Sequence, residues 1–145
     1  MAWLRLVAAI KADPAIMFQM DPWRFEELVA GWYREMGFDE VTLNPRSADH
    51  GRDVIAVKHG VGCVRFIDSV KRYGPHHPVP ANDVRALAGV MAHDPKATKG
   101  IVTTSSVFAP RLMDDPIIAA LVPFRLELVD GAELVKRLSA IAPRA

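Results

Sequence analysis

Asp49-His50-Gly51-Arg52-Asp53-Val54 and Ile67-Asp68-Ser69-Val70-Lys71-Arg72-Tyr73 are the two stretches that decide the fold of this chain. The first reads as a turn that leads into a β-rich run, and the second reads as the end of a strand. Between them, His59-Gly60-Val61-Gly62 predicts a hairpin turn. We therefore expect Asp53 and Lys71 at neighbouring ends of two paired strands.

Alternation of side chains along the second strand, Cys63 to Val70, predicts what each of its faces carries. Ser69 and Lys71 fall on one face, with Arg65 and Ile67. Asp68 falls on the opposite face, among Val64, Phe66 and Val70. Only a β-bulge between Asp68 and Lys71 would bring the Asp68 carboxylate round to Ser69.

The rest of the chain alternates between helix and strand signals. Asp21-Pro22 opens a helix with an apolar stripe, and Gly37 closes it. Further helices are expected at 3–11, through 84–91, from Pro110 with a break at Pro116, and at 133–141, and further strands at 41–43, 100–104 and 124–129. This order predicts an α/β sandwich around a mixed sheet.

Composition describes an ordinary globular chain. With 145 residues, half of them hydrophobic, it can bury one core, and we expect one domain. A net charge of +1 indicates that any basic surface for nucleic acid is local. Cys63, the single cysteine, forms no internal disulfide and no zinc cluster, and its strand predicts a small core residue.

No apolar run in the sequence approaches the length of a membrane span. The patch at 6–10 is interrupted by Lys11 and Asp13, unlike the apolar core of a secretory signal. We therefore expect a cytoplasmic protein with no membrane partner. Residues 1–20 are expected to form an accessory N-terminal helix, and 21–145 the main domain.

A carboxylate and an ammonium at neighbouring strand ends suit the cleavage of phosphodiesters. That chemistry needs an activated water and neutralisation of phosphate charge, which a hard cation provides through oxygen ligands. Asp53 suits the role of ligand, and Lys71 can stabilise developing charge. The pair alone is a weak signal, because many hairpins carry one as a surface ion pair. On the first long helix, Glu26 flanks the apolar stripe, whereas Glu27 points to solvent.

The order of several motifs is more specific than any one of them. In sequence they are Phe25-Glu26-Glu27-Leu28-Val29, Met36-Gly37-Phe38, the two stretches quoted first, Val84-Arg85-Ala86-Leu87-Ala88-Gly89, Gly100-Ile101-Val102-Thr103-Thr104-Ser105 and Leu128-Val129-Asp130-Gly131. This order resembles the Mrr-type restriction endonuclease domain of the PD-(D/E)XK nuclease superfamily, from about Asp21 to the C-terminal helix. The resemblance implies a restriction-endonuclease-like three-layer sandwich, with a central mixed sheet flanked by helices.

The resemblance also implies a site. Asp53 matches the metal-binding aspartate of the family, Lys71 its lysine, and Glu26 the glutamate of the first helix, an auxiliary metal ligand. Divalent metal, usually Mg²⁺ with Mn²⁺ as a substitute, and DNA as the substrate are implied with them. Ser69 departs from the pattern, because the family has glutamine or glutamate there and a hydroxyl is a poor Mg²⁺ ligand. His50 replaces a turn glycine.

Residues just after the second strand are candidates for contact with DNA. Arg72 and Tyr73 predict a small basic-aromatic patch for the phosphate backbone, and His76 in the following loop is the best placed histidine. The alternative is a sheet edge protected by charge and an ordinary loop. Trp23 and Trp32 are expected in the core.

Two classes of function stay open at this point. The first is a metal-dependent endonuclease that hydrolyses DNA phosphodiesters in restriction or defence, with catalytic residues Asp53, Lys71, Ser69 and Glu26. A homodimer is expected if both strands are cut, or else a subunit of a larger complex. The second is a catalytically degenerate module that binds DNA or a protein partner. Ser69 distinguishes them.

Overall fold

A computed structural model gives the structure of the chain, and residues 2–45 and 52–141 are described. The elements are, in chain order, α1 (Ala2–Ala12), α2 (Ile16–Gln19), α3 (Pro22–Glu35), β1 (Glu40–Pro45), β2 (Arg52–Gly60), β3 (Gly62–Lys71), α4 (Ala81–Ala92), β4 (Lys99–Thr104), the 3₁₀ helix η1 (Leu112–Asp114), α5 (Pro116–Leu121), β5 (Leu126–Val129) and α6 (Gly131–Ser139). The turn at 49–51, with His50, lies outside the described residues.

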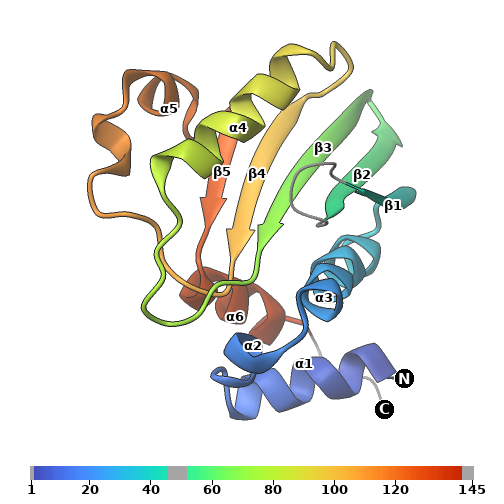
Figure 1. The fold of residues 1–145 in the computed structure, drawn as a ribbon. Helices are drawn as coiled ribbons and strands as arrows, with labels where there is room; N and C mark the ends of the chain where they lie inside the picture. The colour runs from blue at the N-terminus through green and yellow to red at the C-terminus, as the bar shows by residue number, and fades with distance from the viewer. Residues whose placement is uncertain (1, 46–51, 142–145) are drawn as a thin grey trace.

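The strands form one mixed sheet in the order β1-β2-β3-β4-β5 (Figure 1). β1, β2 and β3 pair antiparallel, and β3, β4 and β5 pair parallel. Helices cover both faces of the sheet, because the parallel strands are joined by helical crossovers. The expected three-layer α/β sandwich with a central mixed sheet is therefore confirmed.

Two apolar clusters, one on each face, hold the layers together. On the first face, α3 and α6 pack against Val54, Ala56, Val70, Ile101 and Val129 of the sheet, and α1 adds its buried residues to the same cluster. On the second face, α4, α5 and η1 pack against Ile55, Ile67, Val102 and Leu126. Neighbouring residues of β2 and β3 thus enter opposite clusters, which confirms the predicted alternation along the second strand.

The helix signals around α3 are confirmed. Pro22 is its first residue, and Gly37 follows its end with a φ of 86°, a conformation that favours glycine. The helix predicted from Pro110 was placed wrongly. Pro116 begins α5 rather than interrupting a longer helix, and Asp115 caps it by accepting hydrogen bonds from the two backbone N–H groups at 117 and 118.

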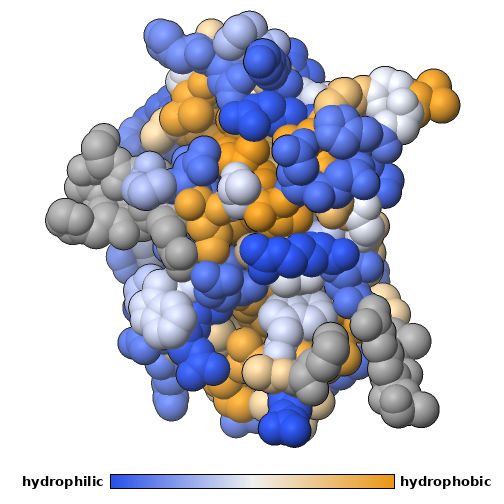
Figure 2. All heavy atoms as spheres, turned by 90° about the vertical axis from the view of Figure 1, so that its right-hand side faces the viewer, coloured by the Kyte–Doolittle hydropathy of each residue, from blue (hydrophilic) through white to orange (hydrophobic). Residues whose placement is uncertain are grey.

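Two expected core residues lie at the surface. Trp23 is 57% exposed. It precedes Trp32 by nine residues, and a helix turns by about 100° per residue, so the two side chains lie on opposite sides of α3. Trp23 lines a groove between α1 and α3. On the face drawn in Figure 2, apolar side chains reach the surface among hydrophilic ones. Cys63 is exposed, because it follows the hairpin turn beyond the packed part of the sheet.

The N-terminal helix α1 packs on the main body of the fold. Val7 and Ile10 are buried in the same cluster as α3 and α6. The Trp3 indole N–H donates to the Leu28 carbonyl at 3.1 Å, and the Lys11 ammonium donates to the Ile141 carbonyl at 3.1 Å. Among the described residues, none of the helices has the length and apolar character needed to cross a bilayer.

Candidate active site

Asp53 and Ser69 are directly paired across β2 and β3. Paired residues of neighbouring strands point to the same face, and Lys71, two residues further along β3, shares that face. Asp53 and Lys71 are half-buried, and Ser69 is 5% exposed. The register therefore places the predicted carboxylate, hydroxyl and ammonium in one row at the end of the hairpin, on the face that carries α4.

The end of β3 is held by its parallel neighbour. Lys71 pairs with Thr104 of β4. The Thr104 hydroxyl donates to the Lys71 carbonyl at 2.7 Å, and the Ser105 backbone N–H donates to the same carbonyl at 3.3 Å. The backbone from which the ammonium extends is thus fixed by β4.

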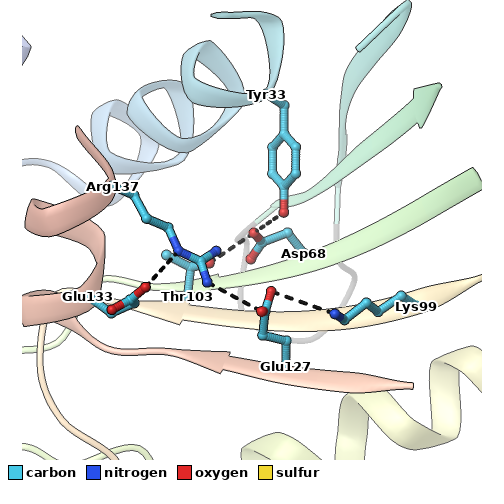
Figure 3. A network of polar contacts seen from close by, with 7 residues as sticks. All are labelled: Tyr33, Asp68, Lys99, Thr103, Glu127, Glu133 and Arg137. Carbon is cyan, nitrogen blue, oxygen red and sulfur yellow. Dashed lines mark hydrogen bonds and ion pairs between the residues drawn. The ribbon is translucent and has the colours of Figure 1, made fainter. Parts of the chain in front are cut away.

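Asp68 points away from this row. β2 and β3 pair without a bulge from Asp53 and Ser69 to the hairpin turn. β3 and β4 also pair without a bulge from Ser69 to Lys71. Asp68 is 1% exposed, and its Oδ2 accepts hydrogen bonds from the Tyr33 hydroxyl at 2.7 Å and the Thr103 hydroxyl at 2.9 Å (Figure 3). The carboxylate next to Ser69 therefore belongs to the opposite face of the sheet, against α3.

Burial sets the charge state of this carboxyl. The pKa of Asp68 is raised to about 7, chiefly because burial removes the hydration of the charged carboxylate. The hydrogen bonds from Tyr33 and Thr103 act in the opposite direction, and the nearby negative charge of Asp53 raises the pKa further. Burial and the Asp68 charge also raise the pKa of the Tyr33 hydroxyl well above its usual value. Within the described residues, Oδ1 of Asp68 has no hydrogen-bond partner. The protonated acid is thus favoured up to neutral pH.

A chain of ion pairs lies beside Asp68 (Figure 3). The Arg137 guanidinium binds Glu133 at 3.1 Å and Glu127 at 3.3 Å, and Glu127 also faces the Lys99 ammonium at 3.9 Å. These residues come from α6, β5 and β4. No sequence motif predicted this polar layer, because its members are far apart along the chain.

Glu26 lies on the inner side of α3. It is 4% exposed, whereas Glu27 lines the surface groove between α1 and α3. Glu26 and Tyr33 are seven residues apart, about two turns, so both face the sheet. The expectation that Glu26 rather than Glu27 turns inward is confirmed. Its role as an auxiliary metal ligand stays a prediction.

A family model described as a restriction endonuclease (Mrr_cat) matches residues 17–138, most of the chain. The chain belongs to the restriction endonuclease family. The predicted family is thereby confirmed. A search of curated proteins finds no match to the chain.

Two solved restriction endonucleases share the fold. The chain is similar to the DNA modification-dependent restriction endonuclease AspBHI, with a TM-score of 0.66 and 19% identity over 95% of this chain and 35% of the other. It is also similar to the MspJI restriction endonuclease in complex with a 27-mer oligonucleotide, with a TM-score of 0.61 and 18% identity over 90% of this chain and 30% of the other. The chain spans about a third of the length of either.

The donor set of this restriction endonuclease domain can be compared with the needs of a divalent cation. Within residues 2–45 and 52–141, no three His, Cys, Asp or Glu side chains form a metal-binding group. On the β2–β3 face, the donors are the Asp53 carboxylate and the Ser69 hydroxyl. Mg²⁺ is often bound through one or two carboxylates, water and substrate phosphate, so the set fits the ion, with few protein ligands.

The three residues expected to contact DNA are directed to different parts of the endonuclease domain. The Arg72 guanidinium donates to the carbonyl of Phe18 in α2 at 2.8 Å. The Tyr73 hydroxyl donates to the Asp83 carboxylate of α4, and its ring stacks on His77 at 4.4 Å between centroids. His76 is exposed in the loop. Contact of these three residues with DNA stays a prediction.

Proposed function

We propose that this chain is a metal-dependent endonuclease domain that hydrolyses DNA phosphodiester bonds in restriction or defence. The observation that carries the proposal is the register that pairs Asp53 with Ser69 and sets Lys71 on the same face. A carboxylate beside an ammonium, at the end of a hairpin anchored by a parallel strand, is an arrangement that can bind a cation and a phosphate together. Membership of the restriction endonuclease family supports the same chemistry.

In this proposal, Asp53 holds the divalent cation, Mg²⁺ or Mn²⁺. Glu26, which belongs to α3 on the other side of the sheet, is proposed as an auxiliary ligand that approaches the cation directly or through water. The bound cation would neutralise charge on the scissile phosphate and supply an activated water. Ser69 contributes a neutral hydroxyl where a second acid would stand, so the site binds the cation weakly. We expect activity to need a higher metal concentration than a site with two or more carboxylates.

Lys71 acts on the phosphate and on the water. Its ammonium extends from a fixed strand end and can donate hydrogen bonds to a non-bridging phosphate oxygen or orient the attacking water. Removing this charge would leave negative charge uncompensated as the water attacks. Lys71 is therefore proposed as the residue that stabilises charge, separate from metal binding by Asp53.

DNA as the substrate is part of the proposal. The MspJI relative is described in complex with a 27-mer oligonucleotide, and its fold is shared here. Because one such site cuts one strand, a double-strand break needs two sites, from a homodimer or from a larger complex. The chain spans about a third of the length of these two structural neighbours.

A second function is favoured by one observation. Ser69, which the resemblance matches to the acid or amide position of the family, is nearly fully buried, and the Asp68 side chain lies on the opposite face of the sheet. A domain that lost catalysis this way would bind DNA or a protein partner without cutting. The two functions differ in whether Asp53 and Lys71 matter for turnover.

The test is cleavage of supercoiled plasmid with Mg²⁺ or Mn²⁺. Wild type is compared with Asp53→Ala, Lys71→Ala and Ser69→Glu, and with Lys96→Ala, an exposed lysine after α4, as a matched control. Cleavage by wild type and Lys96→Ala that is lost in Asp53→Ala and Lys71→Ala supports the nuclease. Cleavage only by Ser69→Glu supports the degenerate module. No cleavage by any variant contradicts the catalytic proposal.

A further inference from the structure

A second group of reactive side chains lies at the other end of the hairpin. The Cys63 thiol lies 3.4 Å from Nδ1 of His59, and Nε2 of His59 lies 2.9 Å from the Glu40 carboxylate. The three residues come from β3, β2 and β1, in that order across the sheet. A nucleophile, a base and a group that orients the base therefore stand in one row.

Strand pairing places this row. His59 is paired directly with Cys63, and Glu40 is paired with Val57, two residues before His59 on the same face. The His59 backbone N–H donates to the Asp39 carboxylate at 2.7 Å, and on the other face Lys58 donates to the Gly37 carbonyl at 3.1 Å. The hairpin end is thus tied to the connection between α3 and β1.

Transfer of the thiol proton to His59 requires one particular tautomer of its imidazole. If Nε2 carries the proton and donates to Glu40, Nδ1 is an acceptor and can receive the thiol proton. An imidazole held between a thiol and a carboxylate is the arrangement by which nucleophilic thiols are activated. We propose that Cys63 is a nucleophilic thiol that reacts with low-molecular-weight disulfides, with His59 as its base and Glu40 as the residue that positions the imidazole.

The reaction forms a mixed disulfide. Nδ1 of His59 takes the proton of the Cys63 thiol, and the sulfur attacks one sulfur of the disulfide. The bond between the two reagent sulfurs breaks, and the departing thiolate takes the proton back from His59. One disulfide and one protein thiol thus become one mixed disulfide and one small thiol. A low-molecular-weight disulfide is the oxidant, and no other co-reactant is needed.

The surroundings leave the thiol open to a reagent. Cys63, His59 and Glu40 are all exposed, and Val61 at the tip of the turn is fully exposed. The nearest cation on the same face of β3 is Arg65, which is paired with Asp94 at 3.1 Å. Cys63 precedes Ser69 by six residues, about 20 Å along the strand. The inference therefore does not rest on the proposed nuclease function.

The experiment uses Cys63 as the single cysteine of the chain. The second-order rate of reaction with dithionitrobenzoate, and then with oxidised glutathione, is measured at pH 7 for wild type, His59→Gln and Glu40→Gln. His93→Gln is the control, an exposed histidine whose Nδ1 contacts the Gly89 carbonyl. Intact mass confirms one adduct per chain, and urea unfolding of each variant confirms that the fold is kept.

We expect His59→Gln to react at least about threefold more slowly than wild type, because the variant lacks the imidazole nitrogen that lies against the Cys63 thiol and can take its proton. Glu40→Gln should fall between the two, and His93→Gln should match wild type. Equal rates for wild type and His59→Gln would overturn the proposal. An equal loss in His93→Gln would also overturn it, because net charge rather than the contact would then set the rate.

Discussion

The Tyr33 hydroxyl donates a 2.7 Å hydrogen bond to the Asp68 carboxylate, and this bond joins α3 to β3 behind the candidate site. Asp68 precedes Ser69 in the chain, yet the two side chains lie on opposite faces of the sheet. Because Thr103 of β4 binds the same carboxylate oxygen, a bulge that turned Asp68 toward Asp53 would break two buried hydrogen bonds. The residue of β3 whose side chain lies beside Asp53 is therefore Ser69 and not Asp68.

The buried Asp68 makes stability depend on pH. Its pKa is about 7 in the folded chain, against 3.8 for an ordinary aspartate, so between these values the unfolded chain has lost a proton that the folded chain keeps. The free energy of unfolding should therefore fall as the pH rises from about 4 to about 7, by up to about 1.4 kcal/mol per pH unit, and level off above. Urea unfolding across this range checks the slope.

Asp68→Asn should remove most of that slope. The amide resembles the protonated acid, and its oxygen can still accept from Tyr33 and Thr103. Above pH 7, we expect the variant to be at least as stable as wild type. Asp114→Asn, a substitution at an exposed position, is the control and should keep the wild-type slope. Identical slopes in wild type and Asp68→Asn would contradict the assignment.

Tyr33→Phe should destabilise the fold by about 1–3 kcal/mol, because it removes one of the two donors to a buried carboxylate. Tyr73→Phe is a matched control, since the Tyr73 hydroxyl also binds a carboxylate, Asp83, but in a half-buried position. Its cost should be smaller, below about 1 kcal/mol. Equal losses in the two variants, measured by urea unfolding at pH 7, would argue against a special role for the buried bond.

Ser69→Glu should raise affinity for Mn²⁺ about tenfold or more, because it places a second carboxylate directly opposite Asp53. Isothermal titration calorimetry measures the change. Ser139→Glu, at the exposed end of α6, adds the same charge away from the site and should have no effect. If Asp53→Ala added to Ser69→Glu left the affinity unchanged, the two side chains would not share a cation.

Gly31→Ala should loosen α1 from α3. A Cβ at Gly31 would lie 2.1 Å from the Trp3 indole nitrogen, so the ring must move, at a cost of about 1–3 kcal/mol. Gly89→Ala in α4 meets no atom within 4 Å and should stabilise the chain by up to about 1 kcal/mol. Thermal unfolding of the pair separates steric overlap from helix propensity. A stabilised Gly31→Ala would show that α1 does not pack closely there.

Strand alternation is a local property, and for that reason the two faces of β3 were predicted correctly. The hairpin turn and the apolar run were enough to place Ser69 and Lys71 together and Asp68 behind them. Gly37 at the end of α3 was predicted for the same reason, because a positive φ is a property of one residue. The family motifs added the order of the helices and strands.

Exposure could not be predicted in the same way. Cys63 lies in a β-rich run, but none of the helices in the described part of the chain covers the end of the hairpin where it stands, so it is exposed beside His59. Trp23 and Trp32 share a helix, but they face opposite sides of it. Whether an apolar side chain is buried depends on what packs above it, and that is set by other parts of the chain.

By itself, the sequence determined the strand pair, the positions of Asp53, Ser69 and Lys71 on it, and the family, because these follow from patterns within short segments. Only the tertiary structure decided that Asp68 is held by Tyr33 and Thr103, each 35 residues away along the chain. Such a bond depends on how α3 and β4 pack against β3. Packing brings together residues that no local pattern relates.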